Sequence, residues 1–138
     1  MAITQTLCNV FKQDCMLGQQ NLTGGAIKMA LYTANATLNA DTTVYTTANE
    51  ATGAGYAAGG NTLTGATVNL SGATAYANFA NSTWTLSAIT ARGALIYNSS
   101  NGKAIAVLDF GADKTSSGGA FTVQFPANDA TNALIRLT

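Results

Sequence analysis

The chain of 138 residues carries only six basic and six acidic side chains, which balance to a formal net charge of zero, and it has no histidine. The missing imidazole excludes nucleophilic systems of the Ser-His-Asp or Cys-His kind. A protein that binds nucleic acid through phosphates needs clustered Lys and Arg, and here they are scattered along the sequence. We therefore expect neither an enzyme nor a nucleic-acid-binding protein, and the length predicts a single domain, 1–138.

The sequence offers no segment for a membrane. It contains no stretch of about 18 uncharged apolar residues, the length that a membrane span needs. Near the N-terminus no basic region precedes an apolar one, and Lys12 and Asp14 interrupt the apolar stretch, so a secretory signal is not expected. We expect a protein that is assembled in a cytoplasm without a membrane partner, and its low net charge favours association with other subunits.

The N-terminal unit, residues 1–18, predicts the one convincing helix, over residues 4–17. Thr4 or Thr6 is the expected N-cap, and Gly18 is the expected stop. An amphipathic helix must bury its apolar stripe, either on its own β-domain or on a neighbouring subunit. The stripe recurs at three- and four-residue steps and consists of Ile3, Leu7, Val10, Phe11 and Leu17.

The only two cysteines, Cys8 and Cys15, lie seven positions apart on this predicted helix. Their Cα atoms would be about 10 Å apart, whereas a disulfide needs Cα atoms within about 7 Å. We expect two reduced thiols, with an intersubunit bridge as the alternative. A metal site would need further ligands, and no histidine supplies them.

From residue 26 onward the apolar pattern changes to a period of two or to short runs, which predicts β-strands joined by turns rich in Gly, Asn, Ser and Asp. Such a pattern favours a β-sandwich, a jelly roll or a small barrel. We expect a mainly β fold, a single β-sandwich of jelly-roll type over residues 26–138. The predicted strands are Ala26–Tyr32, Glu50–Ala54, Thr62–Leu70, Ala75–Phe79, Thr83–Leu86, Gly93–Tyr97, Ala104–Phe110, Phe121–Phe125 and Ala133–Leu137.

Three segments allow sharper predictions. Asn101-Gly102 lies between two apolar strands and predicts a hairpin turn. The strand Ala104–Phe110 is apolar on both faces except for Asp109, so we expect a central strand with Asp109 near an end or hydrogen-bonded. The segment from Thr33 to Thr47 has few large apolar residues and predicts an excursion or loop.

No motif for catalysis or metal binding emerges. Nothing in the spacing of the carboxylates selects a glycosidase pair. Asp109 and Asp113 do not match a calcium loop and are expected to cap their own turns. The glycine-rich stretch from Gly53 to Gly60 is explained by turn geometry, since no Lys-Ser/Thr follows it. Trp84 and the tyrosines form either core aromatics or a sugar-stacking surface. We expect no catalytic residue, no cofactor and no metal.

Three parts of the sequence resemble a group of small tailed-phage virion proteins. The first runs from Phe11-Lys12-Gln13 through Asn21-Leu22-Thr23 to Ile27–Thr33. The stretch from Asn49 to Gly60 is similar to that group's signature Asn-Glu-x-x-Gly-x-Gly-Tyr-x-x-Gly-Gly. The third part, in the C-terminal half, comprises Ala91–Tyr97, Ala106–Gly111 and Phe121–Val123.

The resemblance implies a jelly-roll cement or decoration protein on the capsid exterior, assembled in the bacterial host cytoplasm. It would bind the major capsid protein and itself, as a dimer or trimer. A tail, neck or fibre-attachment protein is the alternative within the same class, and a carbohydrate-binding β-sandwich module that uses Trp84 is the alternative from another class. The expected interface lies on the helix stripe and on the loop from Asn49 to Gly60, with Leu7, Val10, Phe11, Leu17, Asn49, Glu50 and Tyr56 as its residues.

Overall fold

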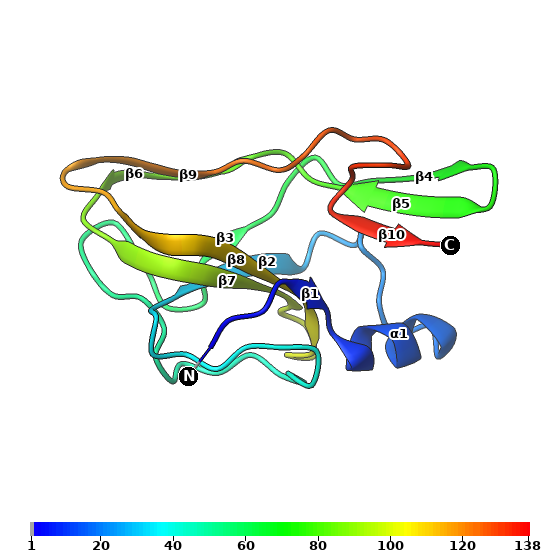
Figure 1. Ribbon diagram of the computed structural model, residues 1–138, viewed down its shortest axis with the longest axis horizontal. Coiled ribbons are helices and arrows are strands. Elements are labelled where there is room, and N and C mark those ends of the chain that lie inside the picture. The colour runs from blue at the N-terminus through cyan, green and yellow to red at the C-terminus, as the bar shows by residue number, and fades with distance from the viewer. Residues whose placement is uncertain (1) are drawn as a thin grey trace.

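The computed structural model describes residues 2–138 and shows a mainly β fold with antiparallel sheets and one helix (Figure 1). The prediction of a mainly β chain with one N-terminal helix is therefore confirmed. The elements are β1 (Thr6–Leu7), α1 (Asn9–Met16), β2 (Ile27–Tyr32), β3 (Asn61–Thr62), β4 (Thr67–Ser71), β5 (Thr74–Asn78), β6 (Ser82–Ser87), β7 (Thr90–Asn98), β8 (Ala104–Thr115), β9 (Gly119–Val123) and β10 (Ile135–Leu137).

A five-stranded antiparallel sheet in the order β1-β8-β7-β2-β3 is the largest in the molecule. Its middle strands β2, β7 and β8 contain near-continuous apolar runs, as strands covered on both faces require. Residues Ala104 to Leu108 of β8 are all buried, whereas Asp109 is exposed and accepts a hydrogen bond from the Gly111 N–H at 2.8 Å. The predicted central strand with a hydrogen-bonded Asp109 is confirmed.

The two smaller sheets are antiparallel: in Figure 1, β6-β9 lies above the five-stranded sheet, and β10-β5-β4 lies above it and to the right. The single strand predicted from Thr62 to Leu70 is wrong, because the chain turns at Gly65 (φ 64°) and divides this stretch between β3 and β4 of different sheets. The strand predicted from Glu50 to Ala54 is also wrong. Gly53 turns the chain with a φ of 141°, and only an isolated bridge between Tyr32 and Glu50 forms there.

The other predicted strands form, with shifted ends. β7 and β8 are joined by the hairpin predicted at Asn101-Gly102, where Gly102 has a φ of 74° and donates its N–H to the Asn98 carbonyl at 2.7 Å. The segment from Thr33 to Thr47 is a loop, as predicted, and makes only isolated bridges. The connections therefore follow the turn residues more closely than the strand ends follow the apolar pattern.

Alternate residues of the central strands face two separate cores. Met29 and Leu31 of β2 contribute to the larger core, which also receives side chains from β6 and β9. Ala30 and Tyr32 point the other way into a second core, which the loop from Thr33 to Thr47 closes with residues such as Leu38. Two covered faces explain why the run Ile27–Tyr32 is apolar throughout rather than alternating.

The helix begins later than predicted. Thr6 and Leu7 form β1, which pairs with β8, so the first part of the predicted helix 4–17 is an edge strand. Cys8 is the N-cap, in place of Thr4 or Thr6, and it makes no side-chain capping bond. Gly18 follows the helix with a φ of 70°, as its predicted role as a stop requires. No helix within residues 2–138 is long and apolar enough to cross a membrane.

Candidate functional site

The most completely bonded polar group of the signature segment is the carboxylate of Glu50. Glu50 is only 8% exposed. Its Oε1 accepts a hydrogen bond from the Tyr45 hydroxyl at 2.6 Å. Its Oε2 accepts one from the Tyr56 hydroxyl at 2.5 Å and one from the Gly59 N–H at 2.8 Å. Both oxygens of this buried carboxylate are hydrogen-bonded, to three donors in all. The carboxylate therefore fixes the surrounding loop.

Tyrosines extend this arrangement into the sheet. The Tyr97 hydroxyl donates to the Gly59 carbonyl at 2.7 Å, and its ring stacks on Tyr45 with centroids 4.5 Å apart. The Tyr56 hydroxyl accepts a hydrogen bond from the Leu31 N–H of β2 at 2.9 Å. We call Tyr45, Glu50, Tyr56, Gly59 and Tyr97 the Glu50 cluster. It ties the signature segment to β2 and β7 through bonds between residues far apart in sequence.

The tyrosines of this region stay neutral. Burial, followed by the bond to Glu50, raises the pKa of Tyr56 far above its ordinary value, and burial together with the charge of Glu50 does the same for Tyr32. The Tyr32 hydroxyl donates to the Thr46 carbonyl at 2.5 Å. None of these phenols is therefore prepared to act as a base near neutral pH.

The glycines of the signature are needed because the chain passes too close to its neighbours for a side chain. A Cβ on Gly53 would lie 1.9 Å from the Ala88 carbonyl oxygen, and one on Gly60 would lie 1.8 Å from the Met29 carbonyl oxygen. Both positions also have positive φ, 141° and 77° respectively. The prediction that turn geometry explains these glycines is confirmed, and close packing adds a second reason.

The predicted interface residues of this segment therefore separate into two kinds. Glu50 lies inside the molecule and Tyr56 is half-buried with its hydroxyl bonded within the chain, so neither presents a free polar group to a partner. Asn49 is exposed, with a φ of 61°, and its carbonyl accepts hydrogen bonds from the Thr33 N–H and hydroxyl. Of the three, only the Asn49 side chain remains available at the surface.

The helix stripe also packs mostly within the chain. Phe11 is 1% exposed in the larger core, and Leu7 and Val10 are half-buried against the two cores. Phe11 therefore cannot be a surface contact, because its own sheet covers it. Leu17 is 61% exposed and its neighbour Met16 is 90% exposed, so the end of the helix keeps apolar surface.

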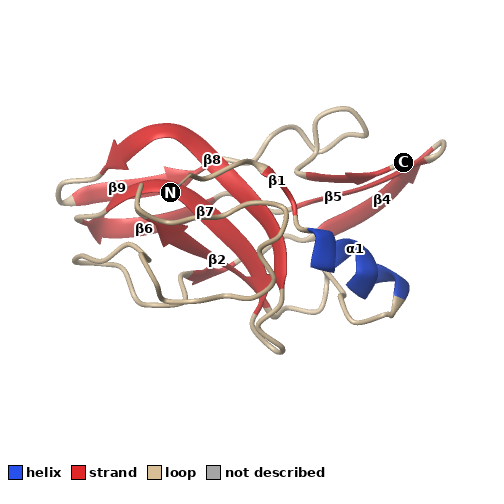
Figure 2. Ribbon diagram, turned by 60° about the horizontal axis from the view of Figure 1, so that its bottom comes forward, coloured by secondary structure: helices blue, strands red, loops and turns tan. Residues whose placement is uncertain are grey.

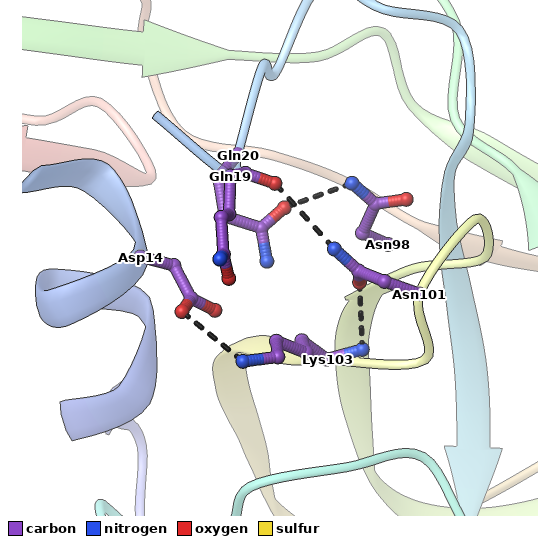
Figure 3. A network of polar contacts seen from close by, with 6 residues as sticks. All are labelled: Asp14, Gln19, Gln20, Asn98, Asn101 and Lys103. Atoms are coloured by element: carbon purple, nitrogen blue, oxygen red, sulfur yellow. Dashed lines mark hydrogen bonds and ion pairs between the residues drawn. The ribbon is translucent and has the colours of Figure 1, made fainter. Parts of the chain in front are cut away.

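Polar contacts fix the end of α1 to the turn between β7 and β8 (Figure 3). Asp14 is fully buried and its Oδ1 lies 3.4 Å from the Lys103 ammonium. The Asn98 amide donates to Gln20 Oε1 at 2.9 Å, and the Asn101 amide donates to the Gln19 carbonyl at 3.4 Å. Because the Asp14 side chain is buried while that of Lys103 is 36% exposed, removal of Lys103 would leave an uncompensated buried charge.

The cysteines are both free, so the prediction that they do not pair with each other is confirmed. Burial raises the pKa of the Cys8 thiol to about 11. Burial, followed by the charge of Asp14, also raises the pKa of Cys15. Thiols with raised pKa values are poor nucleophiles at neutral pH.

Trp84 is 3% exposed and lies between Tyr56 and Phe121, with ring centroids 6.0 and 6.1 Å away. It is a core residue and cannot stack on a sugar. A cleft of about 610 Å³ beside β8 and β9 has Asp109 as its one carboxylate, whereas glycoside hydrolysis uses two. Within residues 2–138 no group of three or more Cys, Asp or Glu side chains is placed to hold a metal ion.

Exposed apolar side chains provide the remaining candidate surfaces. At one place, Leu86 is 80% exposed where the pairing of β6 with β9 is irregular. At another, Val68 and Leu70 of β4 and Leu137 of β10 are 54%, 75% and 40% exposed. Sequence reasoning missed both. The alternation Trp84-Thr85-Leu86 predicts that Leu86 shares the buried face of Trp84, and nothing in the sequence reveals that the strand is irregular there.

Comparison of the chain with protein-family models, with curated proteins and with solved structures finds no match in any of the three.

Proposed function

We propose that this chain is a virion structural protein of a tailed phage: a cement or decoration protein that binds the outside of the head and links neighbouring major capsid subunits. Its scaffold in this proposal is a β-sandwich of jelly-roll type, formed by the five-stranded sheet and the two smaller sheets above it. It acts by binding alone, without catalytic residues, cofactor or metal, and it is assembled in the bacterial host cytoplasm. The resemblance of the segment from Asn49 to Gly60 motivates the proposal.

One observation carries it: the Glu50 carboxylate and the tyrosine hydroxyls of the Glu50 cluster are bonded internally, while large apolar side chains remain at the surface. Scattered exposed apolar residues are normal, but several on a nearly uncharged chain favour contacts with other proteins. Those at least 40% exposed are Met16, Leu17, Val44, Val68, Leu70, Leu86 and Leu137.

The surface that we assign to the shell centres on Leu86. Leu86 has a φ of 48°, and with Asn49 it is one of the two non-glycine residues with positive φ within residues 2–138. A left-handed conformation costs a β-carbon residue about 1–2 kcal/mol, and such strain concentrates at binding sites. The signature loop lies alongside, because the Ala88 N–H donates to the Ala54 carbonyl at 2.9 Å. Asn49 and Leu86 thus lie at the borders of a loop that internal hydrogen bonds hold in place.

The first test is the number of copies of this chain relative to the major capsid protein in purified virions, measured by quantitative mass spectrometry. A simple ratio that gives hundreds of copies supports the cement function. A few copies to tens would overturn it in favour of a tail, neck or fibre-attachment protein. Absence from the particle would overturn every virion function.

The second test is Leu86→Asn. Asn accepts the left-handed conformation, so we expect unchanged stability, or a gain of up to about 1 kcal/mol, together with roughly tenfold weaker co-sedimentation with shells that lack the protein. Val44→Asn is the matched control, since Val44 is 51% exposed and lies in the loop from Thr33 to Thr47, away from β6. Equal binding by both variants would contradict the assignment of this surface.

The carbohydrate-binding alternative depended on Trp84 as the residue that stacks on a sugar, and Trp84 is buried. The tail, neck and fibre-attachment alternatives use the same surface properties, and copy number separates them from a cement protein.

A further inference from the structure

The edge of the three-stranded sheet is open. β4 is its outermost strand, bonded to β5 alone, and all five of its residues are exposed. Natural edge strands are usually protected by charged side chains, proline or bulges. Here no charged residue and no proline occurs between Glu50 and Arg92, and the pairing of β4 with β5 is regular from Thr67 to Ser71. The strand therefore offers a straight, neutral edge for further pairing.

The turn after β4 shows which backbone groups face outward. Ser71 pairs with Thr74 across a two-residue turn, and Gly72 has a φ of 58°, as the first position of a type II′ turn requires. Residues that flank such a turn exchange both their hydrogen bonds, and bonded pairs then alternate along the ladder. It follows that Val68 and Leu70 direct their N–H and C=O groups away from β5, toward the open edge.

One face of this sheet is apolar, and it is partly buried at β5 and β10 but exposed at β4. Leu70 lies opposite Ala75, and Ala75 lies opposite Leu137; the next row is Val68, Ala77 and Ile135. Ala77 and Ile135 are buried in the larger core, whereas Val68 and Leu70 of β4 are exposed to solvent. A groove of about 260 Å³ runs beneath this face, lined on its other side by residues of α1 and the segment after it, including Phe11, Cys15 and Leu22. In Figure 1 α1 lies below this sheet at the same end of the molecule, and in Figure 2 it lies next to β4.

We propose that β4 pairs in antiparallel fashion with β4 of a second copy of this chain, about a twofold axis that passes beside Asn69. Val68 then lies opposite the partner's Leu70, and Leu70 opposite the partner's Val68, and each pair exchanges backbone hydrogen bonds. A twofold axis of an antiparallel pair is perpendicular to the sheet, so the two apolar faces lie on the same side and the two grooves join. The three-stranded sheets of both copies become one continuous sheet.

A second copy fits this surface because the surface is complementary to itself. The sequence Thr67-Val68-Asn69-Leu70-Ser71 alternates polar and apolar residues symmetrically about Asn69, so every side chain meets one of its own kind. β4 carries no charged residue. A twofold contact therefore brings no like charges together, and the partner needs no opposite charge to bind this strand.

The size of the surface sets the strength of the dimer. The exposed parts of Val68, Leu70 and Leu137 and the edge of β4 amount to roughly a few hundred Å² per copy, less than the roughly 800 Å² per partner of a standard interface. We therefore expect a reversible dimer with a Kd of micromolar order. A dimer also presents two Leu86 surfaces, so it would bind a shell by two linked contacts. The dimer itself does not depend on the proposed function.

Sedimentation equilibrium of the full chain over about 1–300 μM tests the association. We expect the mass to rise with concentration from 14.0 kDa to twice that value. Leu70→Lys should raise the Kd at least tenfold, because it places charge on the edge and in the apolar face. Val44→Lys is the control, since Val44 is exposed and lies outside β4, and it should leave the Kd unchanged. A 14.0 kDa monomer at all concentrations, or equal effects of both variants, would overturn the proposal.

A cysteine cross-link tests the register. At the axis, Asn69 and its copy form a non-hydrogen-bonded pair with Cα atoms about 4.5 Å apart, within the range of a disulfide. Asn69→Cys in a Cys15→Ser background should therefore give a covalent dimer on mild oxidation. Thr67→Cys in the same background should not, because two copies of position 67 lie about 13 Å apart in this register. Efficient cross-linking of the Thr67 variant alone would overturn the register.

The outcomes separate this proposal from the proposed function. A chain that stays monomeric and binds shells as a monomer would overturn the dimer and leave the cement function intact. A monomer whose shell binding is abolished by Leu70→Lys would show that β4 contacts the shell, which also overturns pairing with a second copy.

Discussion

The signature loop from Asn49 to Gly60 and the three-stranded sheet β10-β5-β4 consist of similar small, mostly uncharged residues, yet they differ in whether their hydrogen-bonding groups are paired within the chain. In the loop, the Glu50 carboxylate and the tyrosine hydroxyls around it find partners inside the chain. In the sheet, β4 leaves an outer edge unpaired and Leu70 is 75% exposed. The difference teaches that similar residues can complete their hydrogen bonds within one chain or leave an edge unpaired, and the proposed dimer rests on that unpaired edge.

The largest expected effect comes from Gly60→Ala. The new Cβ would lie 1.8 Å from the Met29 carbonyl oxygen, so backbone must move. We expect a loss of about 3 kcal/mol or more in the free energy of unfolding, or no folded protein, in chemical denaturation.

Gly72→Ala in the β4–β5 turn is the matched control. Gly72 also has a positive φ, 58°, but nothing lies within 4 Å of its Cβ position. We expect only the conformational cost of about 1–2 kcal/mol. Equal losses for both variants would show that the close approach at Gly60 does not matter.

Glu50→Gln should have the next largest effect. The amide keeps the shape of the side chain but replaces one acceptor oxygen with a donor, which faces hydroxyl and N–H donors of the Glu50 cluster. We expect a loss of about 2–4 kcal/mol by the same denaturation measurement. Asp109→Asn, at an exposed carboxylate that accepts one backbone hydrogen bond, should change stability by less than about 1 kcal/mol. The Glu50 cluster would be dispensable if Glu50→Gln behaved like this control.

Alkaline pH should have the most gradual effect. The pKa values of Tyr32 and Tyr56 are raised in the folded state, so the folded protein holds these protons more tightly than the unfolded chain, whose tyrosines titrate near pH 10. Their contribution to stability is therefore complete below about pH 10 and is lost as the pH rises above it, by at most about 1.4 kcal/mol per pH unit for each tyrosine.

Melting temperatures between pH 8 and pH 12, recorded with the tyrosinate absorbance, check this effect. Tyr32→Phe should make the decline above pH 10 shallower, because it removes one of the titrating groups. Full ionisation of Tyr32 and Tyr56 in the folded protein near pH 10 would contradict the prediction that their pKa values are raised.

Much of the fold was predictable because it depends on local pattern. Short apolar runs located the central strands, and turn residues such as Gly18 and Gly102 located chain reversals through their positive φ. The helix start was not predictable. Thr6 and Leu7 fit the helical period, yet they pair with the edge of β8 and form β1. A local sequence pattern does not show that a distant strand has an unpaired edge.

The candidate site was predictable only as a segment. The resemblance selected Asn49, Glu50 and Tyr56, but the role expected for them was contact with a partner, and the structure buries the Glu50 carboxylate among tyrosine hydroxyls. Tyr45 and Tyr97 belong to the same cluster although they lie five and 47 positions from Glu50. Such a cluster depends on how strands pair, which the sequence order does not state.

The sequence by itself determined that this chain is mainly β, that it has one short helix region, and which glycines turn the chain, because backbone conformation responds to neighbouring residues. Only the tertiary structure decided which polar groups are buried, that Leu86 points outward, and that β4 keeps a free edge. These properties arise from pairing between distant segments. Whether a strand lies at the edge of a sheet depends on which other strands pair with it.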